Sequence, residues 1–141
     1  MIEGEYRVGF TGTREGMSAK QMARLTERLR EIIAVRDVTS ISFSHGDCVG
    51  ADEEAATIAQ ELGLITIAHP SRDNGMMYRA FHKSDIIRTP KPYMVRNHDI
   101  VLESHFMFVA PRSNEEEQRS GTWATYRFAK KCEVETEVLE R

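Results

Sequence analysis

Short apolar runs alternate with longer amphipathic stretches along the whole chain. Runs of strand length occupy residues 6–11, 40–44, 64–68, 105–110 and 134–139. Between them, residues 18–35, 53–62, 93–102 and 122–131 favour helices, because apolar side chains recur there at spacings of three and four. Strands that alternate with helices form a parallel sheet covered on both faces. The sequence therefore predicts an α/β fold with three layers and a mostly parallel sheet of about five strands.

Composition limits the class of protein further. A length of 141 residues suits a single domain spanning residues 1–141, and the net charge of -3 gives no general basic surface for nucleic acid. The longest apolar run, residues 106–110, is far too short to cross a bilayer, and the first residues lack a signal-peptide pattern. We therefore expect a cytoplasmic protein with no membrane partner.

Cysteine and histidine spacing gives no sign of a metal or a disulfide. Cys48 and Cys132 are the two cysteines, and they lie far apart in the sequence. Four of the histidines (His45, His69, His98 and His105) form no metal-ligand pattern, so we interpret them as structural or exposed. We expect no metal site and no cofactor.

Two local signals mark helix ends, and one long segment stands apart. Ser18 followed by Gln21 is a capping-box pattern, and Gly63 favours the end of a helix. Residues 70–92 are polar, contain prolines at both ends, and exceed the usual length of a loop. Such a long loop is typically functional or mobile, and we expect it to close over a ligand.

Glycine-bearing loops follow the first, second and fourth predicted strands. They read Gly12-Thr13-Arg14, Gly46-Asp47-Cys48-Val49-Gly50-Ala51-Asp52 and Ser120-Gly121-Thr122. The carboxyl ends of parallel strands share one edge of the sheet, so the three loops are expected to meet there. Helix amino ends bind anions, and glycine lets a backbone approach a phosphate closely. This convergence predicts a binding site for a phosphate-bearing ligand.

Charged side chains in and near these loops suit such a ligand. Arg14, Arg96 and Arg119 are candidates for bidentate phosphate contacts, and Asp47 and Asp52 for accepting hydrogen bonds from a ribose or a base. Plainer interpretations exist for three of these features: a Gly-Thr pair forms a tight turn, Asp52 caps its helix, and Arg119 belongs to a solvated acidic loop. Neither a P-loop nor the G-x-G-x-x-G dinucleotide fingerprint is present.

Three motifs together resemble the SLOG superfamily. This group of Rossmann-like proteins includes the Lonely Guy phosphoribohydrolases, the YspA-type proteins and the DprA-type DNA-processing proteins. The motifs are Thr11-Gly12-Thr13-Arg14, the stretch from Ser44 to Asp52 with the alanines after it, and Arg96-Asn97-His98-Asp99-Ile100-Val101 followed by Ser120-Gly121-Thr122. In this order they cover nearly the whole chain.

The resemblance implies a Rossmann-like domain that binds nucleotide-derived ligands and assembles into homo-oligomers. The ligand-binding positions that it implies, together with Ser120 from the third loop, are Gly12, Thr13, Arg14, Gly46, Asp47, Gly50, Asp52, Arg96, Asn97, Ser120, Gly121 and Thr122. Lonely Guy enzymes carry a glutamate shortly after their Gly-Thr turn, whereas this chain has Trp123-Ala124-Thr125 there.

Three functions remain open from the sequence. The first is binding of a nucleotide-type small molecule by a sensor or sequestering protein. The second is a hydrolase or transferase acting on the N-glycosidic bond of a nucleoside monophosphate, with Asp47, Asp52 and Arg96 as the candidate catalytic residues. The third is DprA-like binding of single-stranded DNA, for which the aromatic and basic side chains of residues 78–93 form a candidate cluster.

Overall fold

The computed structural model describes residues 5–141, in which strands and helices alternate. The strands are β1 (Tyr6–Gly12), β2 (Ile41–His45), β3 (Ile65–Ala68), β4 (Ile86–Ile87), β5 (Phe106–Ala110) and β6 (Glu135–Val138). The helices are α1 (Ala19–Ala34), α2 (Ala51–Glu61), α3 (Tyr93–Glu103) and α4 (Gly121–Lys131), with short 3-10 turns at Val38–Ser40 and Asp73–Met76. No helix in this described part combines the length and the apolar character needed to cross a membrane.

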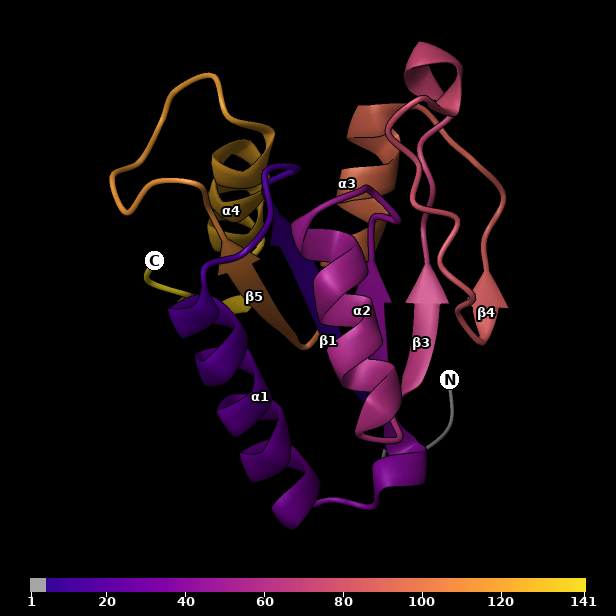
Figure 1. The fold of residues 1–141 in the computed structure, drawn as a ribbon, viewed down its shortest axis with the longest axis vertical. Coiled ribbons are helices and arrows are strands. Elements are labelled where there is room, and N and C mark those ends of the chain that lie inside the picture. The colour runs from indigo at the N-terminus through magenta and orange to yellow at the C-terminus, as the bar shows by residue number, and fades with distance from the viewer. Residues whose placement is uncertain (1–4) are drawn as a thin grey trace.

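All strands belong to one parallel sheet in the order β4-β3-β2-β1-β5-β6. The chain builds outward from β1 to β4 and then returns to place β5 on the other side of β1. Figure 1 shows α1 and α2 in front of the sheet and α3 and α4 behind it. The winding direction therefore reverses at β1, and such a reversal opens a crevice at the carboxyl ends of the strands.

Apolar side chains from both faces of the sheet hold the layers together. The larger cluster lies under α1 and α2 and includes Val8, Phe10, Leu25, Leu29, Phe43, Ala55 and Phe108. The smaller cluster on the opposite face contains Ile100, Val101, Met107 and Ala129. Successive residues of β5 point to opposite faces, so the strand contributes to both clusters.

The predicted capping box at the start of α1 is confirmed. The Ser18 hydroxyl accepts a hydrogen bond from the Gln21 amide at 3.1 Å, and the Gln21 side-chain oxygen accepts one from the Ser18 amide at 2.9 Å. The Gln21 side-chain nitrogen Nε2 also donates to the backbone oxygens of Pro111 and Leu139. The same residue therefore fixes the helix start and ties it to the chain after β5 and β6. Gly63 ends α2 with a φ of +91°, as expected.

The α/β three-layer fold with a parallel sheet is confirmed, with one strand more than the five expected. The additional strand, β4, lies within residues 70–92, which the sequence had indicated as irregular. Ile86 and Ile87 pair with Ile67 and Ala68 of β3. A strand of only two residues between prolines carries no periodic signal, because alternation needs at least four residues.

Candidate functional site

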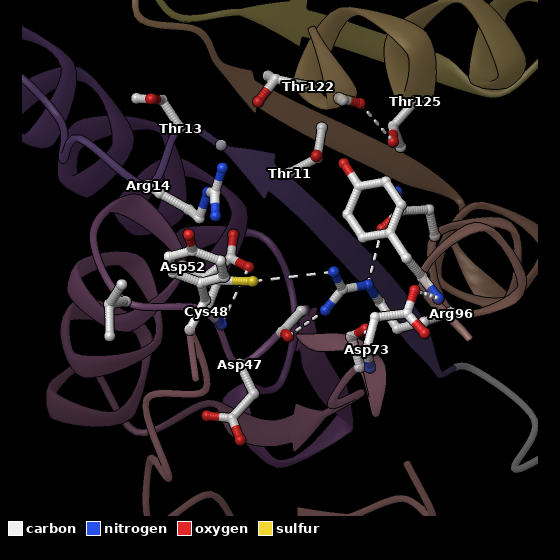
Figure 2. Close-up of a pocket in the computed structure, with 18 of the residues that line it drawn as sticks. Thr11, Thr13, Arg14, Asp47, Cys48, Asp52, Asp73, Arg96, Thr122 and Thr125 are labelled. Carbon is white, nitrogen blue, oxygen red and sulfur yellow. Dashed lines mark hydrogen bonds between the residues drawn. The ribbon is translucent and has the colours of Figure 1, made fainter. Parts of the chain in front are cut away.

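A cavity of about 1000 Å³ lies at the carboxyl ends of β1 and β2, against α3 and the start of α4. Its wall includes all the expected ligand positions except one: Gly12, Thr13, Arg14, Gly46, Asp47, Asp52, Arg96, Asn97, Ser120, Gly121 and Thr122. Figure 2 shows side chains from these separate loops facing one space. The convergence expected from the positions of the strand ends is therefore present in the fold.

Gly50 is the expected position that does not line the cavity. Its φ is +90°, and an added Cβ would lie 2.3 Å from the backbone oxygen of Arg14. Gly50 therefore lets the loop after β1 pack directly on the loop before α2, which positions Arg14.

The amino end of α4 presents donors that the protein leaves unpaired. The Ser120 hydroxyl caps the helix by accepting from the Trp123 amide at 3.2 Å. Within residues 5–141, no acceptor takes the amide hydrogens of Gly121 and Thr122, and the hydroxyl of Thr122 makes no hydrogen bond although only 8% of that residue is exposed. By contrast, the first turn of α2 contains Asp52, Glu53 and Glu54, which oppose an anion. The amino end of α4 therefore offers unpaired donors and has no acidic residue in its first turn.

Two arginines at the cavity lack a carboxylate partner. In the described chain, no carboxylate lies within 4.0 Å of Arg14 or Arg119. The Arg14 guanidinium instead lies over the ring of Tyr78, 3.9 Å from the ring centre. Arg112, which also lines the cavity, is paired with Glu15 and Glu117. Arg14 and Arg119 therefore keep their charge available for an anion.

Arg96 is buried and uses most of its donors within the protein. Its Nε donates to the Asn97 side-chain oxygen at 2.7 Å, and one terminal nitrogen donates to the backbone oxygens of Gly46 and His69. The other terminal nitrogen contacts the Cys48 sulfur at 3.8 Å. Arg96 therefore joins α3 to the loop after β2, and it does not present a free fork for a phosphate. Its contact with a ligand stays a prediction.

Asp47 holds one wall of the cavity rather than facing its centre. Its carboxylate accepts from Arg79 Nε at 3.0 Å and from the His82 amide at 2.9 Å, and Figure 2 shows it turned away from Arg14 and Thr122. Its backbone oxygen accepts from the Ala80 amide at 2.7 Å. Both carboxylate oxygens are thus committed to residues 71–82, which we call the strap.

The strap forms part of the cavity wall. Ser71, Asp73, Asn74, Met76, Tyr78 and Arg79 line the cavity from this segment. The Val49 amide donates to the backbone oxygen of Tyr78 at 2.9 Å, and the Asp73 carboxylate accepts from the Tyr93 amide at the start of α3 at 2.9 Å. The long polar segment is therefore fastened to both neighbouring elements, and it already bounds the space in which a ligand is expected.

Asp52 differs from Asp47 because it is buried without a full set of partners. Its Oδ2 accepts from the Cys48 amide at 3.3 Å, whereas its Oδ1 is buried and has no hydrogen-bond partner among residues 5–141. Burial raises the pKa of Asp52 to about 6, although the nearby Arg96 charge acts in the opposite direction. A simple helix cap does not account for this arrangement, since Oδ1 caps nothing.

Some cavity residues were missed by sequence reasoning. Thr11 lies near the end of β1 and belongs to the Thr11-Gly12-Thr13-Arg14 motif. Its position at a strand end could therefore have predicted that it lines the cavity. Cys48 belongs to the second glycine-bearing loop but was not singled out, whereas Asp73 lines the cavity through a contact with Tyr93 that no local pattern indicates. Burial raises the pKa of the Cys48 thiol. Residues 5–141 contain no group of three or more His, Cys, Asp or Glu side chains placed to hold a metal ion.

No protein-family model and no curated protein sequence matches the chain. Among solved structures, it is similar to a molybdenum cofactor-binding protein from Rippkaea orientalis, with a TM-score of 0.71 and 19% identity over 97% of this chain and 77% of that one. A Moco carrier protein from Chlamydomonas reinhardtii gives a TM-score of 0.65 and 20% identity over 96% and 76% of the two chains. DNA processing protein A from Helicobacter pylori, described with a single-stranded DNA binding mode, gives 0.65 and 18% over 96% and 66%.

Proposed function

We propose that this chain, which has the Rossmann-like fold of the SLOG superfamily, binds a phosphate-bearing nucleotide or nucleotide-derived small molecule as a sensor or sequestering protein. The observation that carries the proposal is the pair of unpaired amides at the start of α4, which share one cavity with the unpaired Arg14. Backbone donors at a helix amino end and a free guanidinium are a natural phosphate site. A cavity of about 1000 Å³ has room for a nucleoside besides the phosphate.

The structural neighbours support this class of ligand. Two of them are described as binding or carrying the molybdenum cofactor, and one as binding single-stranded DNA. The first ligand is a small molecule, and the second is a polymer of nucleotides. A fold that serves both is compatible with a cavity that recognises one nucleotide unit.

Substituting Arg14 with alanine is expected to weaken the binding of AMP by about 10- to 100-fold, equivalent to 1.5–3 kcal/mol for a charge-assisted hydrogen bond. Isothermal titration calorimetry measures the change. Arg30→Ala is the matched control, since Arg30 is exposed on α1 and does not line the cavity. Equal affinities of the two variants would contradict the assignment of Arg14.

Turnover of the ligand is a second candidate function, favoured by Asp52. It is the buried carboxyl of the cavity with a raised pKa, whereas Asp47 is committed to the strap. An ionised Asp52 suits stabilising an oxocarbenium-like transition state or activating water at an N-glycosidic bond. Thr125, which occupies the region of the missing glutamate, donates to the Gly121 oxygen and supplies no carboxylate. Free adenine released from AMP during incubation would establish this function.

Binding of single-stranded DNA is the third candidate, favoured by exposed aromatic rings on the strap. Phe81 is 62% exposed, and the Arg79 guanidinium lies 4.3 Å from its ring centre. Together with the Tyr78 and Arg14 pair, this surface suits stacking of bases. An affinity for an oligonucleotide that falls steeply with salt concentration would support it.

A further inference from the structure

An unsatisfied carboxylate oxygen lies in the inner wall of the cavity. Asp52 is 5% exposed and lines the cavity, and its Oδ1 has no hydrogen-bond partner. The other oxygen holds the Cys48 amide. An unpartnered buried acceptor lowers stability by about 1–3 kcal/mol, so a donor supplied by a ligand would gain a strong interaction there.

The charges around Asp52 do not supply that donor. The charge of Arg96 on α3 lowers the pKa of Asp52. However, no nitrogen of Arg96 lies within 4.0 Å of an Asp52 carboxylate oxygen, so the two side chains form no salt bridge in the described chain. Both side chains abut Gly46, where an added Cβ would lie 2.6 Å from a terminal nitrogen of Arg96 and from Asp52 Oδ2. The remaining neighbours are Asp47, which is paired with Arg79, the Cys48 thiol, which Arg14 also influences, and the Gly46 amide, which lowers the pKa of the Asp52 carboxyl. Within residues 5–141, no hydrogen bond reaches Oδ1 itself.

A second polar group of the same wall complements Asp52. Asn97 uses its side-chain oxygen to accept from Arg96, and its amide nitrogen has no acceptor within the described chain. Asn97 therefore offers a donor, whereas Asp52 offers an acceptor. A ligand group that carries a hydrogen-bond donor beside an acceptor would satisfy both side chains.

Tyr93 links this inner wall to the anion-facing end of the cavity. Its ring centre lies 5.2 Å from the Arg96 guanidinium carbon, and its hydroxyl lies against Gly121, where an added Cβ would overlap it. Figure 2 likewise shows Asp52 and Arg96 on one side of the open space and Thr122 on the other. The length of one tyrosine side chain therefore separates the wall at Arg96 from the amino end of α4. A nucleoside monophosphate is long enough to reach from one to the other.

We propose that the ligand donates a hydrogen bond to Asp52 Oδ1 while its phosphate lies at the amino end of α4. The donor is an amino group on the base or a ribose hydroxyl, and both make the same contact with a carboxylate. This inference rests on the proposed function, and it adds the orientation of the ligand and the group that selects it.

Ionisation of Asp52 gives the inference a signature beyond affinity. The pKa of the free carboxyl is raised to about 6 by burial, and a donor favours the ionised form. The pKa in the complex is therefore lower than in the free protein, so binding releases a proton near pH 6. Affinity is full well above pH 6 and falls as the pH drops through that value, by up to about tenfold per pH unit.

The experiment titrates AMP into the full chain by calorimetry at pH 6 and pH 8, in buffers of different ionisation enthalpy. We expect proton release at pH 6 and little at pH 8. Asp52→Asn is expected to reduce the release to the part that comes from the phosphate of AMP, whose second pKa is about 6. It is also expected to weaken AMP at pH 8 by about tenfold or more, because its amide places a donor against the ligand's donor. Glu15→Gln is the control, since Glu15 lines the cavity but its side chain is 62% exposed and paired with Arg112.

Two AMP analogues identify the source of the donor. Purine riboside monophosphate lacks the amino group, and dideoxy-AMP lacks the ribose hydroxyls. The analogue without the true donor is expected to bind about tenfold more weakly than AMP and to release only the protons that come from its phosphate. The inference is overturned if Asp52→Asn matches Glu15→Gln both in affinity for AMP and in the number of protons released at pH 6. If adenosine binds as tightly as AMP, the proposed function itself is wrong.

Discussion

Replacing Arg96 with methionine is expected to lower the free energy of unfolding by about 2–4 kcal/mol. Methionine fills a similar volume but removes the donors that the backbone oxygens of Gly46 and His69 and the side chain of Asn97 accept. These acceptors would then stay buried without partners. Chemical denaturation monitored by circular dichroism measures the loss.

The control for this substitution is Arg24→Met on α1. Arg24 pairs with Glu27 and Glu137 on the surface, and its side chain is 45% exposed, so we expect a loss below about 1 kcal/mol. If Arg96→Met kept its stability while losing affinity for AMP, Arg96 would be a direct phosphate ligand instead of a structural link. The expectation from the sequence, that the Arg96 guanidinium binds a phosphate, would then be correct even though the guanidinium makes hydrogen bonds within the protein.

Replacing Gly50 with alanine is expected to lower the free energy of unfolding by about 3 kcal/mol or more. The φ of +90° is unfavourable for alanine, and the new Cβ would meet the backbone of Arg14 at 2.3 Å. Backbone atoms cannot rotate away as a side chain can, so the two loops must separate. Thermal and denaturant unfolding measure the loss, and the displacement of Arg14 is expected to weaken AMP as well.

Gly75→Ala separates the two causes. Gly75 also has a positive φ, +60°, but nothing lies within 4 Å of an added Cβ. Its substitution therefore carries only the conformational strain, about 1 kcal/mol. Equal losses in the two variants would show that the close approach of the loops does not limit stability.

Local signals predicted the scaffold well. The Ser18 and Gln21 pair predicted the start of α1 because a capping box uses residues only three positions apart. The glycine loops predicted where the cavity lies because strand ends in a parallel sheet share one edge. Cytoplasmic location and assembly into a homo-oligomer stay predictions.

The contacts that assign roles to the cavity residues could not be predicted. Asp47 and Asp52 are five residues apart in one loop and are equally acidic in the sequence. The partner of Asp47 is Arg79, which lies 32 residues away, whereas one oxygen of Asp52 has no partner. Gly50 resembled a phosphate loop glycine, yet it serves the packing of two loops. Only the tertiary arrangement separates a carboxylate that fastens the strap from one that has an unpartnered oxygen in the described chain.

The most direct test of the phosphate site is a thermal-shift panel in which each nucleotide is compared with its own nucleoside. AMP, GMP and ADP-ribose are measured beside adenosine and guanosine, and each sample is then analysed for released base. We predict that at least one nucleotide raises the melting temperature while its nucleoside does not, because a ligand that binds only the folded state stabilises it. Equal shifts for nucleotides and nucleosides, or no shift for any compound, would contradict the proposed phosphate-binding function.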